Sequence, residues 1–369
     1  MKWACLLIAT AATLGAAEPE PLVNGLSQSS LQTAFQVLRR DYIRHEDLTF
    51  DELNRAALEG LLERVKFSAE LVPTNQKKET AKAGVHSEFL APGVAYLRPE
   101  TLGEGEAAIF EKQLEDSVGK KAQHLILDLR AATDPGSFEE AALMLQCFVP
   151  SGEALFKMKQ IGQSDAELFI SKREPLWPAS VMILIDHETG NAAEALAACL
   201  KNRNRALLVG EKTRGAPVRY SQVQLDEKTS LRYASAEMML PDGSTIFKTG
   251  LKPDHTVPAS LKEKHEVISA TRDASLKPFI LDRVRPRFNE AALVADKNPE
   301  LDDYVKRSQG EPLPNDGGQT RDVVVQHALD LLAAIDLSAQ AKLKWKTPPA
   351  KSTSKAELAP KAVPAKPAS

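Results

Sequence analysis

The segment "ETGNAAEALAACL" (188–200) has the pattern of a tight turn that enters a helix. It follows an apolar, strand-like run, "SVMILID" (180–186), and its alanine-rich continuation is typical of a helix. Many α/β enzymes place a nucleophile on such a strand-to-helix turn. The tip here carries Asn191 instead of a serine or cysteine. Thr189, two residues before Asn191, carries a hydroxyl.

Other kinds of chemistry find little support in the sequence. The seven histidines show no H-x-x-x-H spacing and no cysteine pair nearby, so we expect no metal site. His187, beside the turn, is either a site residue or a polar residue at the end of a strand. The stretch "GEAAIFEK" lacks the glycine spacing of a phosphate loop, and we expect no cofactor.

Charge and the two chain ends bear on partners and localisation. Of the net charge of −3, residues 1–17 carry +1 and residues 342–369 carry +6, which leaves −10 for the body. An acidic body argues against nucleic acid as a partner. Residues 1–17 are typical of a signal peptide, and their apolar run is too short for the alternative, a membrane anchor. No other stretch is long and apolar enough for a transmembrane segment, so we expect an exported protein, periplasmic or extracellular.

The elements that must position the turn follow from hydrophobic periodicity. Leu31, Phe35, Leu38 and Tyr42 recur at helical spacing, and a second helix is predicted to follow a capping box that begins at Thr49. Further along, apolar strands alternate with helices, which indicates an α/β fold with a largely parallel sheet. We predict these strands at 93–99, 124–130, 180–186 and 205–211, antiparallel strands at 218–225 and 230–240, and a last helix at 320–335.

Several segments, in order along the chain, resemble the C-terminal processing peptidases, also called tail-specific proteases. They are "AALEGLLERV", "LILDLRAATDPGSFEEAALMLQCFVPSG", "NRALLVGEKTRGAP" and "LRYASAEMMLPDGSTIFKTGLKPDHTV". The resemblance implies a crotonase-like (ClpP/crotonase) peptidase core that uses a Ser–Lys dyad. Asp128 and Arg130, within the second segment, then resemble a structural ion pair that holds the turn after the strand.

In this resemblance the positions of the dyad do not carry reactive groups. The family's nucleophile falls on Asn191 and its base on Ala216, and the residue that orients the base is Tyr220. The family's oxyanion donors fall on the backbone N–H of Ala192 and the region of Gly136, beside an extra residue near Pro135. An amide is not a nucleophile and a methyl group is not a base, so no catalytic pair is intact. A relocated Thr189–Lys212 pair is the alternative.

The resemblance and the composition together predict the organisation of the chain. The family normally carries a PDZ module between its helical segment and its core. The linker at this position, residues 67–84, is too short for such a module. Cys147 and Cys199 are either a disulfide or two buried thiols, and the apolar surroundings favour the thiols. The expected parts are a signal peptide (1–17), an N-terminal helical segment (18–66), a linker (67–84), a tail-specific protease-like core with an antiparallel extension (85–260), a C-terminal helical region (261–341) and a disordered Lys/Pro/Ala-rich tail (342–369).

Three functions are compatible with these observations. The first is an inactive relative, a pseudoenzyme, that binds an unfolded peptide or protein segment in the former cleft or joins an active relative. The second is an active serine/threonine-type endopeptidase with the relocated groups Thr189 and Lys212. The third is a purely structural envelope protein. The sequence identifies neither the partner nor the oligomeric state.

Overall fold

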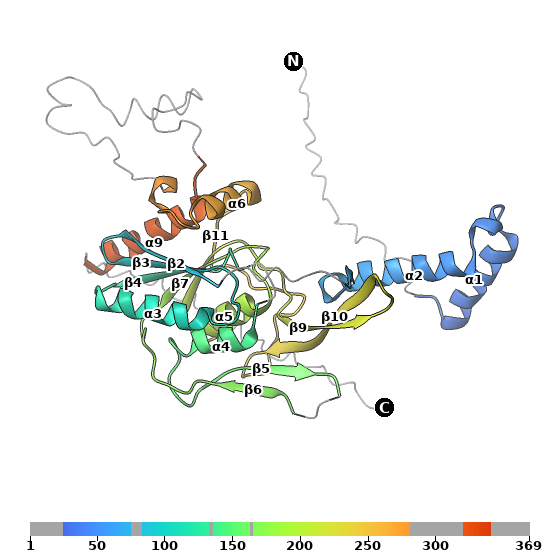
Figure 1. Cartoon of the computed structure of the whole chain (residues 1–369), viewed down its shortest axis with the longest axis horizontal. Coiled ribbons are helices and arrows are strands. Elements are labelled where there is room, and N and C mark those ends of the chain that lie inside the picture. Colours follow the sequence, from blue (N-terminus) through green and yellow to red (C-terminus); the bar gives the residue numbers. More distant parts are fainter. Residues whose placement is uncertain (1–24, 75–82, 133–135, 163–164, 281–319, 341–369) are drawn as a thin grey trace, which may run out of the picture. The chain divides into compact units, whose positions relative to one another are not determined.

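The computed structural model describes residues 25–74, 83–132, 136–162, 165–280 and 320–340 (Figure 1). The predicted signal peptide and C-terminal tail lie outside the described residues, as do residues 75–82 of the linker and 281–319 of the C-terminal region. The chain divides into two compact units, one formed by residues 1–75 and 222–233 and the other by residues 76–221 and 234–369.

The first unit contains two helices and a short strand. Helix α1 (Gln28–Asp41) and helix α2 (Phe50–Val65) are joined through the 3-10 turn η2 (His45–Asp47), and the Thr49 hydroxyl caps α2 at 3.2 Å from the Glu52 N–H. The turn η3 (Lys66–Ser68) then leads into β1 (Ala69–Pro73). The expectation of a patternless linker at 67–84 is therefore wrong at its start. Strand β1 pairs with residues 229–233, more than 150 residues away, so local sequence does not reveal it.

The second unit is built on a six-stranded sheet in the order β11–β8–β7–β4–β3–β2. Its neighbours are parallel except for the antiparallel β2–β3 edge, which confirms the predicted α/β class. The strands are β2 (Val85–Ala91), β3 (Val94–Pro99), β4 (His124–Asp128), β7 (Val181–Ile185), β8 (Ala206–Gly210) and β11 (His255–Thr256).

Successive strand residues point to opposite sides of this sheet, so its buried strands present apolar side chains on both faces. Helices cover both of these faces. Leu125 and Leu127 pack with the layer of α3 (Glu106–Gly119), α4 (Phe138–Leu145) and α5 (Asn191–Asn202). Ile126 packs with the other layer, formed by α6 (Leu261–Ala270), the turn η4 (Lys277–Phe279) and α9 (Val323–Gln340) (Figure 1). The site elements are thus held between two apolar cores.

An antiparallel sheet extends the core. The predicted strands are present as β9 (Val218–Gln224) and β10 (Thr229–Met239). The structure adds β5 (Ala154–Gln160), paired with β10, and β6 (Glu167–Ile170), paired with β5. Sequence analysis missed this pair, since lysines interrupt the apolar alternation of β5 and a turn separates it from the short β6.

The two cysteines are buried free thiols in the described part of the chain, as the apolar surroundings predicted. Burial raises the pKa of Cys147 to about 11 and that of Cys199 to about 12. Each sulfur accepts a hydrogen bond of 3.0 Å from an arginine, Arg173 and Arg203 respectively. Both thiols therefore act as packed, unreactive side chains at neutral pH.

Candidate functional site

The turn between β7 and α5 is fixed by hydrogen bonds within itself. The Asp186 carboxylate accepts from the N–H groups of Glu188 at 2.9 Å and Thr189 at 3.0 Å. The Thr189 hydroxyl in turn accepts from the Asp186 N–H at 3.1 Å, and the side chain is fully buried. Thr189 is thus committed to the structure of the turn.

Asn191 begins helix α5 in a left-handed conformation, with φ of 51°. Asparagine tolerates this region better than other residues with a Cβ. The side chain is only 2% exposed. When the amide is oriented to satisfy its hydrogen bonds, its nitrogen donates to the carbonyl oxygens of Ala216 at 2.8 Å and Val218 at 3.3 Å. The carboxamide is therefore tied to the opposite loop.

Glu194, one turn into α5, holds that loop in place. Its carboxylate accepts hydrogen bonds from the Thr213 hydroxyl, from the Gly215 N–H at 2.7 Å and from the Ala216 N–H at 2.8 Å. The side chain is fully buried. Burial raises the pKa of Glu194 above its ordinary value, although the three hydrogen bonds oppose this shift. Glu194 thereby sets the Ala216 backbone against Asn191.

The structure consequently brings the two dyad positions of the sequence analysis into contact. The Asn191 amide meets the backbone of Ala216, and Ala216 is 1% exposed, with a methyl group as its whole side chain. Tyr220, at the position expected to orient the base, is partly buried in β9. These positions offer neither a nucleophile nor a base.

The two expected oxyanion positions also lie side by side. Gly136 has φ of 61°, and a Cβ added there would lie 3.3 Å from the Ala192 Cβ and 3.0 Å from the Thr101 carbonyl oxygen. Another residue at this position would be strained by its positive φ and would crowd these neighbours. Ala192 lies in the first turn of α5, where backbone N–H groups have no acceptor within the helix. The extra residue near Pro135 lies outside the described residues.

The relocated pair is not assembled in the described part of the chain. Thr189 is fully buried, whereas Lys212 is exposed and lines a shallow pocket with Thr249 and Lys252. No described contact joins Thr189 to Lys212. His187 is half exposed, with Nδ1 3.7 Å from a Glu211 carboxylate oxygen, which is consistent with a polar residue at the end of a strand.

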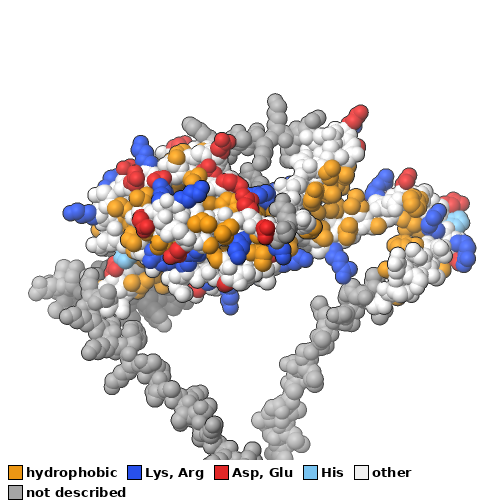
Figure 2. All heavy atoms as spheres, turned by 90° about the horizontal axis from the view of Figure 1, so that it is seen from below, with side chains coloured by type: hydrophobic (Ala, Val, Ile, Leu, Met, Phe, Trp, Pro, Cys, Tyr) orange, Lys and Arg blue, Asp and Glu red, His pale blue; other side chains and the backbone are white. Residues whose placement is uncertain are grey.

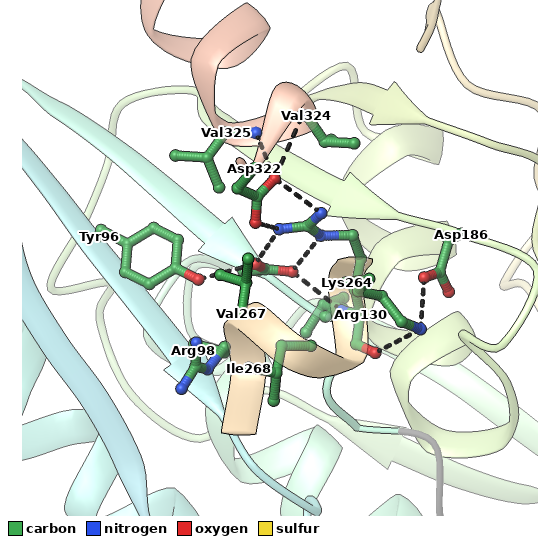
Figure 3. Close-up of polar contacts among 12 residues, drawn as sticks. Tyr96, Arg98, Arg130, Asp186, Lys264, Val267, Ile268, Asp322, Val324 and Val325 are labelled. Atoms are coloured by element: carbon green, nitrogen blue, oxygen red, sulfur yellow. Dashed lines mark hydrogen bonds and ion pairs between the residues drawn. The ribbon is translucent and has the colours of Figure 1, made fainter. Parts of the chain in front are cut away.

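A buried ionic network supports the turn on the face of the sheet that α6 and α9 cover (Figure 3). Arg130 binds Asp128 through Nε at 2.9 Å and Nη2 at 2.7 Å, which confirms the expected ion pair. Arg130 also binds Asp322 at 3.1 and 2.7 Å, and the Tyr96 hydroxyl donates to Asp128 at 2.7 Å. Burial opposes ionisation of Asp128, but the charge and hydrogen bonds of Arg130 hold the pKa of this carboxyl below its ordinary value.

A second buried contact reaches the turn itself. Lys264 of α6 donates to Asp186 at 2.7 Å and to Glu188 at 2.5 Å. Sequence analysis did not single out Lys264, Glu188 or Asp322. Asp322 carried one usable signal, because an aspartate near the start of the helix predicted at 320–335 is a candidate N-cap, and Asp322 does accept the N–H of Val325 at 3.0 Å. A lysine on an amphipathic helix carries no such signal.

The described residues contain no cluster of three or more His, Cys, Asp or Glu side chains that could hold a metal ion. Among the described helices, none combines the length and the apolar character that crossing a bilayer requires.

Comparisons with known proteins agree with this architecture. Residues 93–257 match peptidase family S41. The chloroplastic carboxyl-terminal-processing peptidase 2 of Arabidopsis thaliana is 27% identical over 181 residues, 48% of this chain and 34% of that protein. The carboxyl-terminal-processing protease of Synechocystis is 26% identical over 257 residues, 66% of this chain and 58% of that protein. This chain therefore spans between one third and three fifths of the length of these relatives.

Two solved structures match parts of this chain at lower identity. The photosystem II D1 C-terminal processing protease matches with a TM-score of 0.41 and 20% identity, over 50% of this chain and 52% of that one. A peptidase from Parabacteroides merdae matches with a TM-score of 0.49 and 14% identity, over 65% of this chain and 85% of that one.

Proposed function

Since residues 93–257 of this chain match peptidase family S41 and the chain is similar to C-terminal processing proteases, we propose that its core is a binding domain without peptidase activity. Its ligand is an unfolded peptide or protein segment, held in the former active site. The observation that carries the proposal is the hydrogen bond between the Asn191 amide and the Ala216 carbonyl.

The chemistry of these two positions supports the loss of activity. A serine peptidase needs an attacking hydroxyl and a neutral base beside it. The Asn191 amide nitrogen has a delocalised lone pair and donates to two carbonyl groups. Ala216 supplies no base, and general-base catalysis alone contributes about 10²–10⁴ in rate. Without a nucleophile no acyl-enzyme forms.

The capacity to bind rests on backbone groups, which do not depend on side-chain identity. The first turn of α5 lies beside Gly136, and its backbone N–H groups and the positive end of the helix dipole are suited to bind a peptide carbonyl. The short connection at 67–84 leaves no room for a PDZ module, so we expect binding of extended segments without selection for a free C-terminus. We further propose that this binding takes place outside the cytoplasm, on the basis of the signal-peptide-like residues 1–17.

Binding is tested by fluorescence anisotropy with labelled, unfolded casein fragments. Gly136→Ala adds a Cβ that meets the Thr101 carbonyl oxygen at 3.0 Å and the Ala192 Cβ at 3.3 Å, so we expect affinity to fall at least tenfold, about 1.4 kcal/mol. Gly105→Ala is the matched control, because Gly105 also has positive φ but a Cβ there meets nothing within 4 Å. Equal affinities of both variants and the wild type would rule out this binding site.

The assignment of positions is tested by restoring the dyad. The double variant Asn191→Ser plus Ala216→Lys should cleave casein slowly, while each single variant remains inactive. A lysine at position 216 would be buried, and burial favours its neutral, basic form. Activity in the Ala216→Lys single variant would show that a nucleophile other than residue 191 operates.

A further inference from the structure

A shallow pocket lies at one end of the parallel sheet of the second unit. Strands β8 and β11 run parallel to each other and end at Gly210 and Thr256. Open α/β sheets bind ligands beyond the carboxyl ends of their strands, which is where this pocket lies. Its volume is about 390 Å³, within the range of small-molecule sites. The described residues that line it include neither Asn191, Ala216 nor Gly136, so it is separate from the former active site.

One wall of the pocket is fixed by hydrogen bonds to the loop that Glu194 holds. Thr249 and Gly250 line the pocket. The next residue, Leu251, donates its N–H to the Thr213 hydroxyl at 2.7 Å and accepts the Thr213 N–H at 3.1 Å. Gly250 has φ of 65°, and a Cβ added there would lie 2.4 Å from the Thr213 carbonyl oxygen, so the two backbones are in contact. The pocket therefore has a preformed wall, as small-molecule sites usually have.

Two lysines line this pocket without a carboxylate partner. Lys212 and Lys252 are exposed, and neither forms an ion pair with another described residue. Asp254, two residues after Lys252, is already engaged, because its carboxylate accepts from the Lys201 ammonium at 3.0 Å and from the Leu208 N–H at 2.9 Å. Two ammonium groups at one pocket repel each other, and an anion bound between them removes this repulsion.

The charge of the pocket is opposite to that of the body of the protein. Residues 18–341 carry a net charge of −10, and Figure 2 shows basic and acidic side chains interspersed over the face that it presents. Among the described residues that line the pocket, two are lysines and one, Glu211, is acidic, which gives a net charge of +1. A positive pocket on an acidic body favours an anion at this place alone.

We propose that this pocket binds a small anionic ligand through a carboxylate or phosphate group. The ammonium groups of Lys212 and Lys252 and the exposed hydroxyls of Thr249 and Thr256 are donors to the oxygens of that group. Hydrogen bonds between charged partners of this kind are stronger than neutral ones. The proposal does not depend on the proposed peptide binding, since it concerns different residues and a different readout.

Isothermal titration calorimetry of the full chain with citrate and with inorganic phosphate tests this site. We expect a dissociation constant below about 1 mM for at least one of them, and the tighter one identifies the group as carboxylate or phosphate. Lys212→Gln and Lys252→Gln should each weaken binding about tenfold, because each removes a charge-assisted hydrogen bond. Glu211→Gln should strengthen binding roughly threefold, because it removes a repelling charge. Added salt should weaken binding to the wild type.

The matched control is Lys112→Gln with Lys120→Gln, which changes two exposed lysines outside the pocket and should leave the affinity at the wild-type value. This control is needed because residues 342–369 carry seven further lysines that attract anions. The bound ligand should also protect Lys212 and Lys252 from acetylation, as read by mass spectrometry. A chain that binds neither anion overturns the proposal. Binding that both pocket variants leave unchanged also overturns it, since the anion would then lie elsewhere on the chain.

Discussion

Replacing Asn191 with alanine tests whether this side chain is a structural element of the former active site. The change removes two hydrogen bonds, to the carbonyl groups of Ala216 and Val218, worth about 1 kcal/mol each. It also places alanine at φ of 51°, where a residue without asparagine's tolerance loses about 1–2 kcal/mol. We therefore expect Asn191→Ala to lower the free energy of unfolding by about 3–4 kcal/mol.

Two further variants separate these contributions. Asn191→Gly loses the same hydrogen bonds, but glycine adopts positive φ without strain, so it should be more stable than the alanine variant by about 1 kcal/mol. Asn204→Ala is the matched control for the backbone alone, since Asn204 has φ of 54° and is exposed. It should lose only the backbone contribution, about 1–2 kcal/mol.

The measurement is urea unfolding, followed by circular dichroism and by the fluorescence of Trp177, which is 4% exposed in the core. An Asn191→Ala variant as stable as the wild type would refute the reasoning. That result would mean that residue 191 is held under strain and without good hydrogen bonds, as reactive groups in working enzymes often are.

Three other predictions follow from the site and the core. Glu194→Gln leaves only one oxygen for the donors of the loop at 213–216, and it should destabilise the protein by about 2–3 kcal/mol in the same urea experiment. Because the pKa of Asp128 is lower in the folded protein than in the unfolded chain, its ion pair with Arg130 contributes stability above about pH 4 that is lost as pH falls through the folded value. Acid titration of Asp128→Asn should accordingly show a less stable protein at neutral pH and a flatter decline below pH 4, and an identical slope in both proteins would contradict this assignment. Cys147 and Cys199 should not react with iodoacetamide at pH 8 in the folded chain but should both react in urea, as read by mass spectrometry; labelling of either residue in the native protein would contradict their burial.

The sequence predicted the fold where the local pattern is strong. Strands β4, β7 and β8 are apolar runs that end in charge or glycine, and α5 follows a recognisable turn, so periodicity alone locates them. Strand β1 escaped prediction because its identity as a strand comes from pairing with residues 229–233. Local propensity carries no information about a partner so far along the chain.

The candidate site, like the fold, could be predicted only in part. That residues 191 and 216 meet could be predicted, because the resemblance to the C-terminal processing peptidases implies a nucleophile and its base at these two positions. What the amide does there could not, since its acceptors are backbone carbonyl groups of a loop whose course Glu194 determines. Lys264 was also beyond prediction, because its partner Asp186 is 78 residues away and the ion pair depends on how α6 packs on the sheet.

The central claim is that the Asn191–Ala216 pair makes the S41 core of this chain inert as a peptidase. The most direct measurement is the release of fluorescent fragments from labelled casein by the purified wild-type chain, with Lys212→Ala assayed in parallel. The account predicts the same rate for both proteins, equal to that of buffer alone. Cleavage by the wild type that the Lys212→Ala change abolishes would contradict it and would assign catalysis to relocated groups.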